Sequence, residues 1–559
     1  MTMKKILIML AFVAMLAVTM WGEKRIFVMS DIHVMAPELL VEDGEAFRRY
    51  VESDPKLLRQ SAEVLLALAD TIRRYDPDLI IIPGDLTKDG ELVSHRMVAE
   101  VLEKLRGEGY PTLLVPGNHD IENPHGKYFK GAATEPAQRT SPEAFAEIYS
   151  KFGYDDASQR DPASLSWAKE PFEGLVVIGL DSNWYYKNQY VERGDPADVN
   201  QTAGGLREAT LQWAIDIADR AMADGKQVIA IAHHNILEHY DGQSFIARPY
   251  VIDDWENVAD NLTKHGVSIV FTGHQHLHDI AKRYRSAEMK DSLIDVTTGS
   301  TVSYPNPWRL VTVNDDFSKW NFATGYVRQT ASLDNVQETC RQTLADNISG
   351  GLKWHIRQYW PKIQEIIEEN SSLIEKWKVN VPATPEEMTS LAMDYFGHLF
   401  VEAFLINVAG NEEDNPRSKE SVGEFKTQVA KLVNDRVGKA SEVVNVYVEN
   451  ILNDNVYSWL NSMMNDVNQW GTAMASVTDD LDGKPRQGGN SGGGGGDSGY
   501  YDLNGRFVGN ALSNLRDGQI YVTRGKKVLK TTTPQPTTPQ PTTPQSTTPQ
   551  STTPQPTMP

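Results

Sequence analysis

The stretch LIIIPGD, residues 79–85, ends a short apolar run in a proline, a glycine and an aspartate. Four consecutive apolar residues bounded by turn residues are typical of a strand that is buried on both faces. Asp85 follows directly where such a strand opens into a loop. In layered α/β folds, functional side chains gather on the loops at the carboxyl ends of strands. The stretch therefore predicts a buried strand that leads to a site, although Gly84-Asp85 alone is also an ordinary turn.

Runs of the same kind recur on both sides of this stretch, up to about residue 325. Helical stretches such as 57–75, 91–106 and 206–223 separate them. Strands that alternate with helices predict a layered α/β domain over residues 24–325. The other expected strands cover residues 26–29, 112–115, 175–180, 227–232 and 267–271.

Polar motifs follow these runs, and histidines concentrate among them. Eleven of the 13 histidines lie between His33 and His278. Residues two apart in an extended chain point to the same side, so Asp31 with His33, and His274 with His276, can converge. Besides Gly84-Asp85, the motifs are Asp31-Ile32-His33, Gly117-Asn118-His119-Asp120, His233-His234-Asn235 and Gly273-His274-Gln275-His276.

The donor types in these motifs predict a transition-metal site. Carboxylate, imidazole and amide oxygen together suit Mn, Fe or Zn better than calcium. Cys340 is the only cysteine, which excludes a disulfide, a thiolate cage and a CxxC pair. An Asp-x-His triplet alone is more often a surface accident. The Gly-His-x-His motif is sharper, and the ordered set makes chance polar loops a poor explanation.

This ordered set closely resembles the calcineurin-like metallophosphoesterases over residues 24–325. The resemblance implies a four-layer α/β/β/α sandwich that holds two metal ions. Residues 84–91 and the closing stretch from Thr298-Gly299-Ser300 to residues 307–310 are similar to the branch of class III cyclic-nucleotide phosphodiesterases. A tyrosine that purple acid phosphatases carry shortly after this Gly-Asp is missing, which argues against that branch.

The resemblance also implies a role for each motif residue. Asp31, His33 and His276 would hold the first metal, while Asn118, His233 and His274 would hold the second. Asp85 would bridge the two ions. We choose His233 over His234, because the family ligand is the first histidine of its motif.

The implied reaction is hydrolysis of a phosphate monoester or diester by a hydroxide that bridges the two metals. Asn118 would orient a phosphoryl oxygen, and His119 would assist the leaving group. Some relatives pair this histidine with an acidic residue three positions after the bridging aspartate. That position is Lys88 here and Asp89 follows it, so the partner of His119 stays open. Residues that could support the ligands from behind are Asp120, His234, His239 and His278, with solvated loop positions as the alternative for the last two.

The overall charge restricts the partners. The chain has 559 residues and a formal net charge of -21. A phosphate-tracking nucleic-acid binder normally has a basic stripe, so we expect no duplex nucleic acid. A small phosphorylated substrate remains compatible, because bound cations would supply local positive charge. The oligomeric state is left open.

Residues 330–480 follow a different pattern. Apolar residues recur every three or four positions, as at Leu352, Ile356 and Ile363, which predicts a separate helical domain. Thr384-Pro385-Glu386-Glu387 has the form of a helix start. Aromatic residues on the helix faces, such as Trp354 and Trp360, are expected to be core.

The two ends of the chain suggest export. Residues 1–22 combine a basic start with a short apolar core, as signal peptides do, with an uncleaved anchor as the alternative. We expect no stable membrane span.

Residues 481–499 are a Gly-rich linker, and residues 531–559 are a Thr/Pro/Gln repeat that we expect to be disordered. Residues 500–530 contain hairpin signals at Asn504-Gly505 and Arg524-Gly525, and this segment resembles the C-terminal sorting domains of type IX secretion cargo. The protein is therefore expected in the periplasm, at the cell surface or in the medium.

Two other functions are consistent with this organisation. The helical region and tail could bind a partner, with the metal domain a vestigial scaffold of a surface adhesin. A nuclease is the third possibility, which the acidic charge disfavours.

Overall fold

The structure is a computed structural model that describes residues 23–155, 157–191, 197–284, 292–410 and 416–437, with four short strands between residues 500 and 529. The chain divides into two compact units, Met1–Gln487 and Gly488–Pro559. The expected signal peptide, Gly-rich linker and repeat tail lie outside the described residues.

The first unit contains a five-stranded sheet built around the strand that the sequence predicted at residues 79–82. Strands β1, β3 and β4 run parallel, and β14 and β15 extend the sheet antiparallel on the β1 side. The order is β15-β14-β1-β3-β4, with bounds β1 Lys24–Val28, β3 Leu79–Ile82, β4 Thr112–Leu114, β14 Pro307–Val313 and β15 Trp320–Tyr326.

A second sheet of seven strands has a parallel centre and antiparallel edges. Its order is β12-β13-β11-β10-β9-β8-β7, and β13, β11, β10 and β9 are parallel. Its strands are β7 Gln159–Arg160, β8 Trp167–Phe172, β9 Leu175–Leu180, β10 Gln227–Ala232, β11 Val267–Thr272, β12 Asp279–Tyr284 and β13 Ser292–Thr297.

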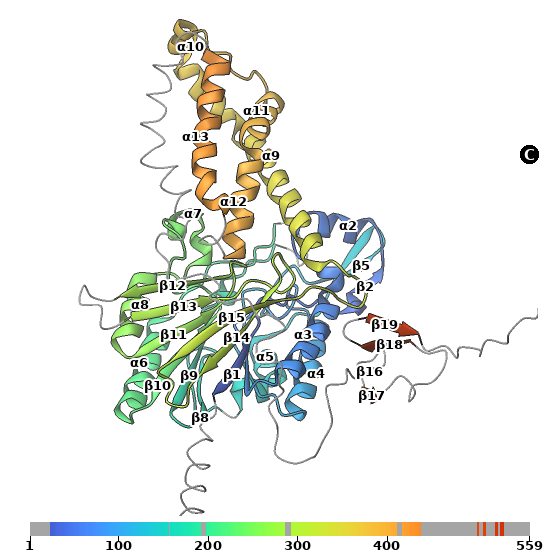
Figure 1. Ribbon diagram of the computed structural model, residues 1–559, viewed down its shortest axis with the longest axis vertical. Helices are drawn as coiled ribbons and strands as arrows, with labels where there is room; N and C mark the ends of the chain where they lie inside the picture. The colour runs from blue at the N-terminus through green and yellow to red at the C-terminus, as the bar shows by residue number, and fades with distance from the viewer. Residues whose placement is uncertain are drawn as a thin grey trace, which may run out of the picture. The chain divides into compact units, whose positions relative to one another are not determined.

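Alternate residues of the second sheet enter two different cores, which explains its continuous apolar runs. Ile229 and Ile231 belong to the core shared with the first sheet and with helices α3 (Ser61–Tyr75) and α4 (Leu92–Gly107). Val228 and Ala230 belong instead to the core beneath helices α6 (Glu208–Ala223) and α8 (Trp255–Lys264). Figure 1 shows the two pairs of helices beside the two sheets. The predicted mixed α/β architecture is therefore present.

Shorter elements fill the loops around this framework. A three-stranded sheet packs with α2 around Phe47 and Phe129, and the sequence analysis did not predict it. These elements are η1 Pro37–Leu39, β2 Leu40–Glu42, α2 Glu45–Glu52, η2 Leu58–Gln60, β5 Lys127–Lys130, β6 Ala133–Pro136, α5 Pro142–Ile148, η3 Ser150–Tyr154, η4 Tyr185–Lys187, α7 Gln243–Ile246 and η5 Arg248–Tyr250.

Helices α9 to α13 form what we call the helical arm (Figure 1), comprising α9 Val336–Glu369, α10 Ser371–Trp377, α11 Pro385–Ala392, η6 Met393–Gly397, α12 His398–Ala409 and α13 Pro416–Val437. The predicted helix start is present, because Thr384 Oγ1 accepts a hydrogen bond of 3.1 Å from the Glu387 amide. The expectation for Trp354 was wrong, since its side chain is 56% exposed. The i, i+3, i+4 pattern indicates a helix, but which aromatic residues reach the core depends on where neighbouring helices pack.

One segment of the arm, Pro385–Ala409, is long and apolar enough to cross a membrane by length and composition. We had expected no stable span. A single segment of this kind is weak evidence, because core helices of soluble proteins pass the same test. In α12 the apolar side chains of Leu399, Ala403, Leu405 and Ile406 are buried within the protein.

The second unit contains a four-stranded sheet in the order β17-β16-β18-β19. Its strands are β16 Tyr500–Tyr501, β17 Phe507–Gly509, β18 Ile520–Thr523 and β19 Lys526–Leu529. The strands on both sides of each predicted hairpin turn pair antiparallel. The turns themselves lie outside the described residues.

Candidate metal centre

The seven predicted ligands all lie on loops that follow the parallel strands. Asp31 and His33 follow β1, Asp85 follows β3, and Asn118 follows β4. From the other sheet, His233 follows β10, while His274 and His276 follow β11. The carboxyl ends of both sheets therefore meet at one site, as the strand placement predicted.

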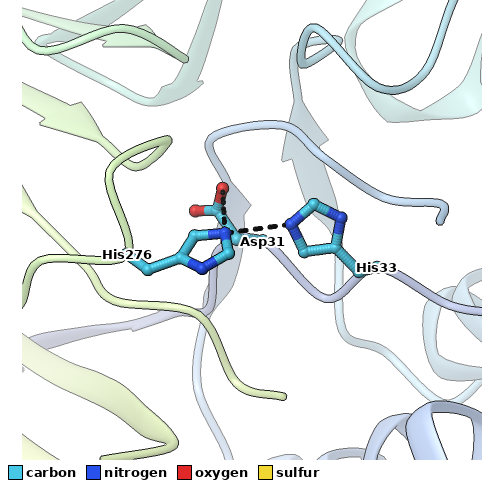
Figure 2. A group of neighbouring side chains, drawn as sticks. All are labelled: Asp31, His33 and His276. Carbon is cyan, nitrogen blue, oxygen red and sulfur yellow. Dashed lines mark hydrogen bonds and ion pairs between the residues drawn. The ribbon is translucent and has the colours of Figure 1, made fainter. Parts of the chain in front are cut away.

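The first group of donors consists of Asp31, His33 and His276, which Figure 2 shows pointing toward one another. His33 Nε2 lies 3.0 Å from His276 Nε2, and His276 Nε2 lies 3.7 Å from Asp31 Oδ1. Two imidazole nitrogens at this distance can share at most one proton, and a metal ion would satisfy both lone pairs. This geometry fits a metal.

The second group consists of Asp85, His233 and His274. Asp85 Oδ2 lies 3.4 Å from His233 Nε2 and 3.6 Å from His33 Nε2, so this carboxylate stands between the two groups. His233 Nε2 also lies 3.1 Å from Asn118 Oδ1. All seven predicted residues are thus brought to one place, with the Asp85 carboxylate between the two groups.

His233 and His234 differ in which nitrogen is free. The Nδ1 of His233 lies 2.8 Å from the Pro83 carbonyl oxygen, which leaves Nε2 facing Asp85. In His234, Nδ1 contacts the Ser182 hydroxyl and Nε2 contacts the Thr202 carbonyl oxygen, at 2.8 and 2.9 Å. Metal-binding histidines commonly use one nitrogen for the ion and the other for a carbonyl. This contrast supports the choice of His233.

The backbone at the ligands is left-handed at five non-glycine positions. The φ angles are +49° at Asp31, +38° at His33, +49° at Asp85, +74° at His274 and +60° at His276. Such conformations cost on the order of 1–3 kcal/mol each and cluster at functional sites. The sequence contains no sign of them, because glycine would be the usual residue there.

Two motif glycines provide space for the aspartates. A Cβ atom on Gly117 would lie 2.1 Å from Asp85 Oδ1, and one on Gly273 would lie 2.3 Å from Asp31 Oδ2. At these two positions φ is not left-handed, so backbone conformation does not require glycine there. The glycines are needed because the carboxylates occupy the space of a side chain.

Burial and neighbouring charges shift the pKa values of the carboxylates and histidines in this site. Burial raises the pKa of Asp31 to about 7, with Asp85 adding to the rise. Burial opposes the charge of Asp85 too, but His233 and His119 hold its pKa well below the ordinary value. Against the effect of its own burial, His233 has its pKa raised to about 9 by Asp85. A cation bound beside Asp85 would compete with a proton on His233.

His119 lies at the edge of this site and is partly open to solvent. Its backbone amide donates to Asp85 Oδ1 at 2.8 Å. Its Nδ1 lies 2.7 Å from the Lys88 carbonyl oxygen and 3.2 Å from Asp89 Oδ1. The acidic side chain beside His119 is therefore that of Asp89, the residue after Lys88.

Lys88 itself turns away from His119 into a buried cluster. Its ammonium contacts the carboxylates of Asp89 and Glu91, the latter at 2.9 Å, and lies over the ring of Tyr50. Tyr50 donates to Asp89 Oδ2 at 2.7 Å. Sequence reasoning missed Tyr50 and Glu91, because nothing along the chain links them to the motif.

The other residues predicted near the ligands are buried, and one of them bonds to the motif loops directly. Asp120 accepts hydrogen bonds from the amides of Leu86, Thr87 and Gly117, so it holds the second and third motif loops together. His239 and His278 are fully buried, so the alternative of solvated loop residues was wrong for both. Sequence reasoning also missed His95, whose Nε2 lies 2.8 Å from the Asp120 carbonyl oxygen; a lone histidine in a helix gives no signal.

The family of calcineurin-like phosphoesterases has a model that matches residues 24–278. This match covers a little under half of the chain. The match ends after the last histidine motif, whereas β14 and β15 of the first sheet extend to Tyr326.

Similarities to individual proteins are more distant. The chain is 40% identical over 72 residues to a probable cyclic nucleotide phosphodiesterase of Rhodopseudomonas palustris, which is 12% of this chain and 25% of that protein. The chain thus spans about a quarter of the length of this curated relative. The match to the phosphoesterase family points to a hydrolase of phosphoric ester bonds.

Two solved structures are also similar. A dimetal phosphatase from Danio rerio has 14% identity and a TM-score of 0.33, covering 54% of this chain and 98% of that one. The phosphopantetheinyl hydrolase of Mycobacterium tuberculosis has 12% identity and a TM-score of 0.25, covering 50% and 91%. Likenesses this distant carry no argument about substrate or metal.

Proposed function

We propose that the protein hydrolyses phosphate esters with two transition-metal ions, drawn from Mn, Fe and Zn. The observation that carries this proposal is the position of Asp85 Oδ2, within 3.6 Å of a histidine from each donor group. Two ions held there would lower the pKa of a coordinated water and neutralise charge on phosphoryl oxygens. The first ion is assigned to Asp31, His33 and His276, and the second to Asn118, His233 and His274, with Asp85 between them.

His119 is assigned to the leaving group. Its Nδ1 is held by the Lys88 carbonyl and Asp89, which leaves Nε2 of a partly exposed ring as the atom that can pass a proton to a departing oxygen. Asn118 is assigned to orient a phosphoryl oxygen. The adjacent Asp89 keeps a positive charge on His119 favourable, as a general acid requires.

The substrate is proposed to be a small phosphorylated molecule, with phosphodiesters tested before monoesters. The relative from Rhodopseudomonas palustris, similar over 72 residues, is a probable cyclic nucleotide phosphodiesterase. The formal net charge of -21 disfavours a long polyanion.

A substrate panel with defined metal content tests the proposal. Full-length protein is stripped with a chelator, reloaded with Mn²⁺, Fe²⁺ or Zn²⁺, and assayed on bis(p-nitrophenyl) phosphate, p-nitrophenyl phosphate and cyclic nucleotides. We expect no hydrolysis after stripping and recovery with at least one metal. His119→Ala should lower the rate by about a hundredfold, whereas the matched surface change His265→Ala should not. Absence of bound metal and of hydrolysis would instead favour the vestigial scaffold of a binding protein.

We also propose the domain layout and the location of the protein, as the sequence predicts them. We infer a four-layer α/β/β/α sandwich over residues 24–325, a helical domain over 330–480 and an exported protein with a signal peptide at residues 1–22. Residues 500–530 are proposed as a sorting segment, since paired strands flank both predicted turns. Cell fractionation of the native host, with and without residues 500–559, tests the location. Recovery of the intact chain only in the cytoplasm would reject export.

A further inference from the structure

The helical arm reaches the metal centre through the loop that carries two of its ligands. We call residues 273–278 the metal loop. At its far end, the amide of His278 donates a hydrogen bond of 3.2 Å to the carbonyl oxygen of Val408 in helix α12. The contact lies two residues from the ligand His276, and it joins segments that are 130 positions apart in the chain.

Apolar packing strengthens this junction. Leu277 is 1% exposed and forms a small core with Tyr240 and with Ala403 and Ile406 of α12. The Tyr240 hydroxyl accepts a hydrogen bond of 2.9 Å from the side chain of Gln275. The side chains of Gln275 and Leu277, which alternate with the ligands His274 and His276, are therefore held on the side of the arm.

The end of α12 approaches the metal loop too closely for any side chain. A Cβ atom on Gly410 would lie 1.5 Å from the His278 carbonyl oxygen, and Gly410 has a φ of +62°. Glycine is required at this position for both reasons. The close approach keeps the last turn of the helix against the backbone of the metal loop.

The metal loop needs such support because both of its ligands are strained. His274 and His276 have φ angles of +74° and +60°, which persist only where the surroundings determine them. On the Gly273 side, the His274 amide donates to the Asp31 carboxylate at 3.1 Å, and the Gly273 amide donates to the His233 carbonyl oxygen. At the His278 end, the corresponding support comes from the contacts of α12, which are the hydrogen bond to Val408 and the packing of Ala403 and Ile406.

We infer that the foot of the helical arm, Ala403, Ile406 and Gly410 with the Val408 carbonyl, is a positioning device for the ligands His274 and His276. The inference rests on the proposed metal-dependent function. It gives the arm a task at the metal centre, so a change in how α12 packs alters metal affinity. Outer residues that orient metal ligands typically contribute 10–100-fold to affinity.

Metal titration of matched variants tests this inference. Full-length wild type, Ile406→Ala and Gly410→Ala are stripped with a chelator and titrated with Mn²⁺ by calorimetry, while thermal unfolding of each metal-free protein is recorded. The controls are Phe404→Ala, on the same helix but 39% exposed, and the conservative Ile406→Val. We expect the first two variants to bind Mn²⁺ about tenfold more weakly, and both controls to bind as wild type does.

The outcomes separate this inference from the proposed function. If wild type binds Mn²⁺ and the folded Ile406→Ala variant binds it equally well, the foot of the arm is only structural and the inference is overturned. A lower unfolding temperature without weaker binding has the same meaning. If wild type binds no Mn²⁺, Fe²⁺ or Zn²⁺ at all, the proposed function fails together with the inference. Should Gly410→Ala not fold, Ile406→Ala decides the matter.

Discussion

Two groups of histidines lie on the loops that follow the strands, and they differ in how their nitrogens are used. At the metal centre, His33 and His276 turn Nε2 atoms toward each other at 3.0 Å. In the neighbouring cluster, His239 places Nδ1 2.8 Å from Asp279 Oδ2 and Nε2 3.6 Å from Asp295 Oδ2. The first arrangement brings two imidazole nitrogens together, whereas in the second each nitrogen faces a carboxylate, with a hydrogen bond at Nδ1 and an ion-pair distance at Nε2.

The backbone shows the same difference. His33 and His276 are left-handed, whereas His239 is not among the residues with positive φ. Buried histidine and aspartate are therefore not by themselves a sign of a metal site. Convergent free lone pairs on strained backbone distinguish the metal centre from the structural cluster of His239, Asp279 and Asp295.

The largest expected effect separates the two groups by activity. Asp85→Asn keeps the shape of the side chain but removes the charge that stands between the donor groups. We expect the rate of phosphodiester hydrolysis to fall by about a thousandfold, because the negative charge that would hold the proposed ions is lost. Steady-state kinetics with metal analysis measures this. As a control, Asp70→Asn on the exposed side of α3 should retain the wild-type rate.

A change in the cluster of His239, Asp279 and Asp295 should affect stability rather than activity. His239→Ala leaves the carboxylates of Asp279 and Asp295 buried without their partner, which typically costs about 3–5 kcal/mol. Urea unfolding monitored by circular dichroism measures the loss. The hydrolysis rate per folded molecule should stay within a few-fold of wild type. A rate loss as large as that of Asp85→Asn would show that the two groups form one functional unit.

The same histidine predicts a dependence of stability on pH. Although burial alone would lower it, the pKa of His239 is raised to about 9 by Asp279 and Asp295. A pKa raised on folding stabilises the protein fully below about pH 6.5, and this contribution is lost as the pH rises toward 9. The loss should be about 3 kcal/mol. His233 titrates in the same direction, so both proteins are loaded with metal before they are compared. We expect the unfolding free energy of His239→Gln to fall less than that of wild type between about pH 6.5 and pH 9.

The smallest effect is expected far from both groups. Trp354→Ser on α9 removes a side chain that is 56% exposed and should change the unfolding free energy by less than about 0.5 kcal/mol. Chemical denaturation compares it with wild type. A destabilisation above 2 kcal/mol would mean that this face of the arm is covered in the folded protein, as the sequence had suggested.

Much of the framework could be read from the sequence because burial on both faces leaves continuous apolar runs. The predicted strands at 79–82, 175–180 and 227–232 coincide with β3, β9 and β10. The predicted helix at 91–106 differs from α4 by one residue at each end. The three-stranded sheet around Phe129 was missed, since β6 is fully exposed and carries no apolar pattern.

The sequence by itself determined which residues could form the metal centre, because donor type and spacing after a strand are local properties. Tertiary structure decided how they are used. It turned His234 toward Ser182 and Thr202, placed Asp89 beside His119, and brought Gly410 against His278. Those contacts join positions 30 to 132 residues apart, and no local pattern encodes a distance in space between such segments.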